Sequence, residues 1–274
     1  MPAERAVNWN SDDQVWEYIA ECPPPPIATR LLNTNARWAE GTHSQKIFSQ
    51  AVRVWSTYLA RLYQIRTRYL AESDQVSQYY SLLESVTLGG QPLDTLPRRF
   101  EDLTVCYIGG SIRISLEFET FYMAAKALLE RIAITFNFYF GLTGSEREGS
   151  AHHRLADNFK TLHCRIGNRT KTPKRLLEML RTLNTDIVRF RTDHIEHPHH
   201  PSSGLTSGSF PYIDNDDKYM LTFAVSKGKS GLANIPVPPH LLIPRIEEYI
   251  AEMLDYFETY RHVSVLVDTP PGNG

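Results

Sequence analysis

The sequence predicts a mainly α protein, a helical bundle with one or two small β-hairpins. In several long segments, apolar residues recur at alternating steps of four and three, which is the period of an amphipathic helix. The hydrophobic content of 42% and the charged content of 22% are ordinary for a globular protein. Only two stretches, 102–115 and 218–239, carry the pattern of β-hairpins. Helices are therefore expected to form the core.

The first 42 residues are expected to form an N-terminal arm outside that core. A short helix at about 11–21 precedes the run CPPPPIATR (22–30), and proline runs favour an extended polyproline II conformation. The helical bundle is then expected as a single domain over 43–262. The end of the chain, 263–274, closes with DTPPGNG and is expected to be a flexible tail.

Four long helices are expected to supply the core, at 43–69, 116–140, 174–197 and 241–261. The first carries an apolar stripe made of Phe48, Val52, Trp55, Leu59 and Leu62. The second is apolar almost all round, which predicts a central buried helix that ends at Gly141. The third carries the stripe Leu176, Leu180, Leu183, Ile187 and Phe190. Shorter helices are expected at about 73–87 and 147–166.

The β structure is expected to be limited to hairpins. The run DLTVCYIGGSIRIS (102–115) places two β-rich halves around Gly109-Gly110, a typical turn pair. KYMLTFAVSK (218–227) and LANIPVPP (232–239) are expected to form a short β pair. The composition of 198–210 predicts a loop before them.

Composition and charge narrow the class of protein. A formal net charge of −2 gives no global electrostatic attraction to nucleic acid or membrane. Three distant cysteines do not suggest a disulfide framework and fit a reducing compartment. The N-terminus lacks the basic start and apolar run of a signal peptide, and no charge-free apolar run of about 18 residues occurs. We expect a soluble cytoplasmic protein with no membrane span.

The segment RFRTDHIEHPHHP (189–201) concentrates two arginines, two acids and four histidines. If the leucine stripe of 174–197 continues past Phe190, His194 and His197 fall on the same face. Arg191 then lies about 100° around the helix from Phe190. Pro198 disfavours helical geometry at the residue before it, so the helix is expected to end at His197.

These residue types suit the cleavage of RNA by attack of the 2′-hydroxyl. That reaction needs a general base and a cation that stabilises the developing charge on the phosphorane. In this interpretation His197 is the base and Arg191 stabilises the phosphorane, while Asp193 and His194 orient or tune them. A symmetric partner would bring a second set of these residues across the seam of a homodimer.

RFRTDHIEHP resembles the arginine–x(4–6)–histidine motif of the HEPN superfamily. The order of elements is also similar: an apolar helix with an internal acid (FETFYMAAKALLERIAITF, 118–136), a shorter helix, and the motif-bearing LLEMLRTLNTDIVRFRTDHIEHP. The resemblance covers about 116–200. It implies a HEPN-like bundle that forms a homodimer and acts on RNA without metal or cofactor, as a ribonuclease or a toxin-type defence factor. One departure is that Thr192 directly follows the arginine, with Asp193 one place later.

A basic stretch precedes the motif. Between Arg154 and Arg191 there are ten lysines and arginines against three acidic residues. Such a surface could hold a phosphate backbone. The candidate RNA contacts are Arg165, Arg169, Lys171, Lys174, Arg175 and Arg181. Alternatively, these cations only solvate the outer face of an amphipathic helix.

Three other interpretations of the histidine cluster remain open. His194 and His197 could act as C-terminal caps that oppose the helix dipole, by about 0.3–1 kcal/mol each. The helical face could belong to a non-catalytic binding or assembly protein. Finally, metal ligands for a hydrolase are offered by His194, Glu196, His197, His199 and His200, to which His152, His153 and His163 from a neighbouring helix could add. The segment lacks the HExxH general base, so no metal site is assigned.

Overall fold

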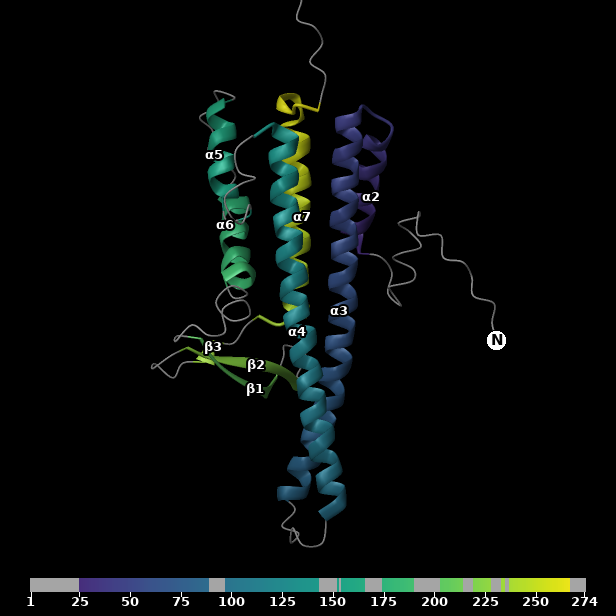
Figure 1. The fold of residues 1–274 in the computed structure, drawn as a ribbon, viewed down its shortest axis with the longest axis vertical. Helices are drawn as coiled ribbons and strands as arrows, with labels where there is room; N and C mark the ends of the chain where they lie inside the picture. Colours follow the sequence, from purple (N-terminus) through teal and green to yellow (C-terminus); the bar gives the residue numbers. More distant parts are fainter. Residues whose placement is uncertain are drawn as a thin grey trace, which may run out of the picture. The chain divides into compact units, whose positions relative to one another are not determined.

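A computed structural model describes residues 25–88, 97–142, 152, 154–165, 174–189, 203–213, 219–227, 233–234 and 237–266. This part of the chain is mainly helical, as predicted (Figure 1). The helices are α2 (Pro26–Ala39), α3 (His43–Leu88), α4 (Pro97–Phe140), α5 (Leu155–Arg165), α6 (Lys174–Leu183), the π-helix η2 (Asn184–Arg189), α7 (Pro239–Thr259) and the 3₁₀ turn η5 (Arg261–Val263). The strands are β1 (Ser203–Ile213), β2 (Tyr219–Lys227) and β3 (Ala233–Asn234).

Spatial contacts divide the chain into two compact units. Unit 1 is drawn from Met1–Gln64, Ala124–Thr185 and Ile243–Gly274, and unit 2 from Ile65–Met123 and Asp186–Leu242. The long helices α3 and α4 therefore contribute one part to each unit. The expectation of one domain over 43–262 stays a prediction.

Helix α2 corrects the expectation of an N-terminal arm. Residues Pro26–Ala39 are helical rather than extended, and Ile27, Ala28, Leu31 and Trp38 are buried in unit 1. The proline run begins this helix because a proline in the first turn lacks only an N–H that would have no helical partner, and its fixed φ suits the helix. The prediction that this segment lies outside the core is wrong for Pro26–Ala39.

The core of unit 1 is formed by the first part of α3, the last part of α4, and α7. The stripe predicted from Phe48 to Leu62 is buried, which confirms this amphipathic face. Aromatic rings join the helices, with centroids 4.7 Å apart for Tyr139 and Phe257 and 5.6 Å for Phe48 and Phe257. The Trp55 Nε1–H donates to Thr135 Oγ1 at 3.2 Å. Helix α7 thus lies beside α4 in this unit (Figure 1).

Helix α4 ends at the predicted glycine. Gly141 has a φ of +60°, a left-handed conformation that residues with a Cβ adopt at a cost. The N–H of Leu142 donates to the carbonyl of Asn137 at 2.9 Å, and that of Gly141 to Phe138 at 3.3 Å. These two bonds form a Schellman motif. The helix predicted for 116–140 is therefore confirmed as the C-terminal part of α4.

In unit 2, the hairpin predicted for 102–115 is wrong. These residues belong to α4, which is helical throughout Pro97–Phe140. Gly110 is buried against α3, and a Cβ there would lie 2.1 Å from Val76 Cγ2. Gly110 therefore allows α3 and α4 to approach closely and does not form a turn. Packing on α3 overrides the local β preference of the branched residues.

Helix α3 runs without interruption where two helices were predicted at 43–69 and 73–87. Within unit 2, two ion pairs join it to α4. The Arg68 guanidinium holds both carboxylate oxygens of Glu117, at 2.7 and 2.9 Å. Arg113 Nε donates to Glu72 Oε2 at 2.8 Å.

A three-stranded antiparallel sheet of order β1-β2-β3 also belongs to unit 2. Phe210 of β1 pairs with Thr222 of β2, and Val225 of β2 pairs with Asn234 of β3. β2 lies within the predicted stretch 218–227, whereas β3 covers only Ala233–Asn234 of the predicted 232–239, and Pro239 begins α7. The loop predicted for 198–210 is wrong for 203–210, which lie in β1.

Candidate functional site

The four predicted catalytic residues, Arg191, Asp193, His194 and His197, lie outside the residues that the structure describes. Their assignment stays a prediction. The structure does describe the helix that leads to them. The stripe Leu176, Leu180, Leu183 and Ile187 is buried, as predicted.

The last described turn of this helix is not an α-helix. Residues Asn184–Arg189 form a π-helix, in which each N–H bonds to the carbonyl five residues back rather than four. Each turn therefore takes up about one more residue. The prediction that His194 and His197 share the buried face with Phe190 requires the helix to be α-helical throughout. The π-helix changes that period, so this face is no longer predicted for the two histidines.

A partly buried polar cluster holds the start of the π-helix. His152 Nδ1 lies 2.7 Å from the side-chain oxygen of Asn184, and the backbone N–H of His152 donates to Glu130 Oε2 at 3.2 Å. The Tyr249 ring stands at 82° to the His152 ring, with centroids 5.8 Å apart. Among the described residues the buried Tyr249 hydroxyl has no hydrogen-bond partner, and burial raises the pKa of this tyrosine.

The polar cluster was not identified from the sequence. Its members, Glu130, His152, Asn184 and Tyr249, come from four separate segments and share no spacing that a motif search would find. Only His152 was considered, as a metal ligand. The available signal was Glu130, a half-buried acid among the apolar residues of α4, because a carboxylate withdrawn from water needs a hydrogen-bonding partner.

Two of the histidines considered as metal ligands, His152 and His163, are buried in the core of unit 1. His163 is buried, its Nε2 lies 3.1 Å from the Tyr256 hydroxyl, and burial lowers its pKa. His152 is held by Asn184. Within the described part of the chain, no cluster of three or more His, Cys, Asp or Glu could hold a metal ion.

Two of the predicted RNA-contacting cations have structural partners. Arg165 donates to the carbonyls of Phe140 and Gly141, at 2.8 and 3.2 Å, and so caps the end of α4. Arg175 forms ion pairs with Glu248 and Glu252 of α7. The hydrogen bond to Glu248 and the nearby carboxylates of Glu252 and Glu248 raise the pKa of Arg175.

Two of the remaining predicted cations, Lys174 and Arg181, lie within the described residues. Lys174 and Arg181 are exposed on α6. Arg175 keeps 64% of its side chain exposed despite its ion pairs. Arg169 and Lys171 lie outside the described residues. Helix α6 therefore carries three accessible cations, one of them already paired with carboxylates.

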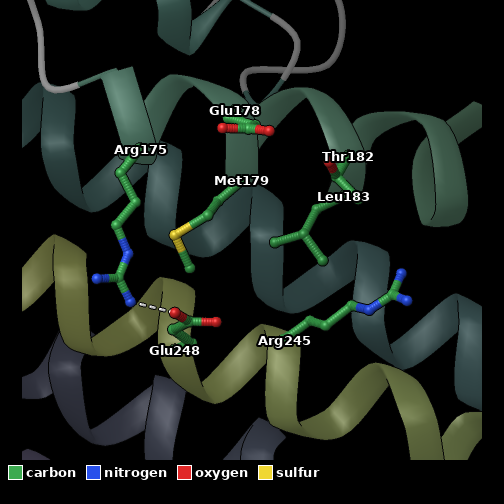
Figure 2. A pocket seen from close by; sticks show the side chains of 7 residues that line it. All are labelled: Arg175, Glu178, Met179, Thr182, Leu183, Arg245 and Glu248. Atoms are coloured by element: carbon green, nitrogen blue, oxygen red, sulfur yellow. Dashed lines mark hydrogen bonds and ion pairs between the residues drawn. The ribbon is translucent and has the colours of Figure 1, made fainter.

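A shallow hollow lies between α6 and α7 in unit 1 (Figure 2). It is lined by Arg175, Glu178, Met179, Thr182, Leu183, Arg245 and Glu248. Its volume of about 190 Å³ is smaller than the roughly 300–1,000 Å³ of drug-sized ligand sites. Figure 2 shows the Arg175–Glu248 pair at one end and Arg245 extending toward the other. Two arginines against two glutamates leave no net charge on its lining.

The aromatic run and the cysteines differ in their exposure to solvent. Phe136, Tyr139 and Phe140 of the aromatic run FNFYF are buried, which confirms their place in the core. Cys106 of α4 and Cys164 of α5 are free and exposed. Within the described ranges, none of the helices combines the length and apolar character that a membrane span needs.

Comparison with protein-family models, curated proteins and solved structures found no match to this chain.

Proposed function

We propose that the chain is a HEPN-like protein that acts on RNA as a metal-independent ribonuclease of the toxin or defence type. Arg191 and His197 are the residues expected to carry the reaction. The observation that supports the proposal is the setting of the motif. The motif follows directly on a helical segment, α6 and η2, whose apolar stripe is buried and whose outer side carries Lys174, Arg175 and Arg181.

The order of helices supports the same proposal. Helix α4 carries the internal acid Glu130, the shorter α5 follows, and α6 with η2 leads into the motif. The polar cluster connects these parts, because Glu130 and Asn184 both bond to His152. Such a connection would fix the position from which the motif segment departs.

In the proposed reaction His197 takes the proton from the 2′-hydroxyl of the RNA. The 2′-oxygen then attacks the adjacent phosphorus and forms a 2′,3′-cyclic phosphate, while the bond to the 5′-oxygen breaks and this oxygen takes up a proton from solvent to leave as a hydroxyl. Arg191 stabilises the additional negative charge on the phosphorane. Asp193 and His194 orient these two side chains. Lys174 and Arg181 attract the phosphate backbone.

The test is cleavage of a labelled single-stranded RNA by the full chain in the presence of EDTA. Removing a general base costs roughly 10²–10⁴-fold in rate. We therefore expect His197→Ala to lower the rate by about that factor, and Arg191→Ala by about 10²–10³-fold, as for other groups that stabilise a developing anion.

The neighbouring loop residues provide matched controls. His199→Ala and His200→Ala remove the same side chain beyond Pro198 and are expected to keep the wild-type rate. Equal rates for wild type, Arg191→Ala and His197→Ala would rule out the proposed catalytic roles.

A second candidate function is that of a non-catalytic assembly protein. The exposed apolar residues on the N-terminal part of α4 favour it, because contiguous apolar surface commonly marks a protein interface. Absence of RNA cleavage by the wild-type chain, together with stable self-association, would favour this function over the first.

A further inference from the structure

Helix α4 carries an exposed row of large apolar side chains in unit 2. Val105 is 70% exposed, Ile108 52%, Ile112 64% and Leu116 62%. They are spaced by three, four and four residues, so they lie on one side of the helix. We call this row the α4 stripe.

The opposite side of the same helix is already packed. Gly110, Ile114 and Phe118 are buried, with Gly110 against Val76 of α3. The stripe is thus a second apolar face of α4. No described residue buries it. Single exposed apolar residues are normal on a protein surface, whereas a continuous row indicates an interface.

The pattern of the stripe suits another helix. Apolar residues repeating at three and four, with β-branched Val and Ile among them, form the seam of paired helices. The seam is flanked by polar or charged exposed positions, including Asp102 and Arg113. These flanking charges distinguish the possible partners.

We propose that the α4 stripe pairs with the α4 stripe of a second copy of this chain, in an antiparallel arrangement centred on Ile108. Val105 then lies within about 1.5 Å, one residue of helical rise, of the level of Ile112 of the second copy. Asp102 and Arg113 lie on the same flank of the seam, and in an antiparallel pair the same flanks meet. Asp102 of one copy therefore lies beside Arg113 of the other, at both ends of the contact.

The charges favour this orientation over a parallel one. A parallel pair would place Glu101 and Asp102 of both copies at the same end of the contact. Like charges facing each other destabilise an interface. In the antiparallel pair Arg113 would join Asp102 of the second copy while it also holds Glu72, which makes a small ion-pair network.

This assignment does not rest on RNA cleavage. The stripe belongs to a part of α4 that precedes the predicted motif by about 75 residues, and a seam there differs from one formed by Arg191 and His197. A dimer made by the motif segment alone would survive disruption of the stripe, and this difference separates the two arrangements.

The first experiment is the mass of the full chain in solution by light scattering after gel filtration. We expect wild type to have twice the mass of one chain, and Ile108→Glu and Ile112→Glu to have the mass of one chain with unchanged helical circular dichroism. Val54→Glu is the matched control, since Val54 is a 38% exposed apolar residue on α3 outside the stripe, and it should remain dimeric. A monomeric wild type, or dimeric Ile108→Glu and Ile112→Glu proteins, would overturn the proposal.

A second experiment tests the orientation without destabilising the seam. With Cys22, Cys106 and Cys164 changed to serine, Ile108→Cys should form a disulfide-linked dimer on mild oxidation, because Ile108 faces its own copy. Leu116→Cys should not, because the two Leu116 positions would lie about 24 Å apart along the helices. Cross-linking at both positions would indicate a parallel pair, and cross-linking at neither would exclude the contact; either result contradicts the proposal.

Discussion

At the residue scale, burial decides the role of the polar side chains in unit 1. His152 and His163 were candidate metal ligands, yet each is buried beside a polar partner, Asn184 and Tyr256 respectively. Burial also raises the pKa of Tyr139 to about 12, and its hydroxyl donates to the carbonyl of Phe257 at 3.1 Å. Burial therefore favours the neutral forms of His163 and Tyr139.

His163 is expected to make the stability of the protein depend on pH. Burial lowers its pKa below the usual value of about 6.5. As the pH falls through that value, the imidazole of the unfolded chain takes up a proton while that of the folded chain stays neutral. The unfolded state then binds more protons, so the free energy of unfolding decreases as the pH falls. His163→Gln should reduce this decrease, measured by urea denaturation at pH 7.5 and 5.5.

The His163→Gln protein is itself expected to be less stable at neutral pH, because a buried contact changes. The informative quantity is therefore the difference in unfolding free energy between the two pH values. An equal difference for wild type and variant would show that His163 does not contribute.

At the element scale, α4 shows how packing overrides local sequence preference. The glycine pair at 109–110 lies between β-branched residues and predicted a turn. In the structure the two glycines have different surroundings. Gly110 is buried against Val76, whereas a Cβ at Gly109 would meet only Arg113 Nη1 at 3.7 Å, an ordinary contact.

The two glycines provide a matched pair of variants. Gly109→Ala should stabilise the protein by about 0.5–1 kcal/mol, because alanine loses less backbone entropy in a helix. Gly110→Ala should destabilise it by about 1–3 kcal/mol, because its Cβ would overlap the stiff, buried Val76. Urea denaturation followed by circular dichroism measures both. If 102–115 were a hairpin, neither difference would be expected.

The period-based predictions succeeded where one helix face is buried along its whole length. The stripes from Phe48 to Leu62 and from Leu176 to Ile187, and the helix end at Gly141, follow from local spacing and backbone geometry alone. Three features depend on contacts between distant segments and could not be predicted: the helical start at Pro26, the approach of Gly110 to Val76, and the polar cluster. The π-helix at Asn184 also has no periodic signal, and it interrupts the stripe on which the placement of the histidines depended.

At the scale of the whole molecule, the two proposals concern two separate segments of the chain. The motif segment after η2 is proposed to cleave RNA, and the α4 stripe is proposed to join two copies. Because they lie in different segments, variants of one are expected to leave the other unaffected. Ile108→Glu should therefore abolish dimerisation through α4 and keep the wild-type rate of RNA cleavage.

The chemistry of the RNA ends tests the central claim most directly. Attack by the 2′-hydroxyl leaves a 2′,3′-cyclic phosphate on one product and a free 5′-hydroxyl on the other. Direct attack by water on the phosphodiester forms no cyclic phosphate. Mass spectrometry of the fragments made by the EDTA-treated chain should therefore show cyclic phosphates. It should show none with the His197→Ala protein. Fragments with 5′-phosphate and 3′-hydroxyl ends, or no fragments from the wild-type chain, would contradict the proposed reaction.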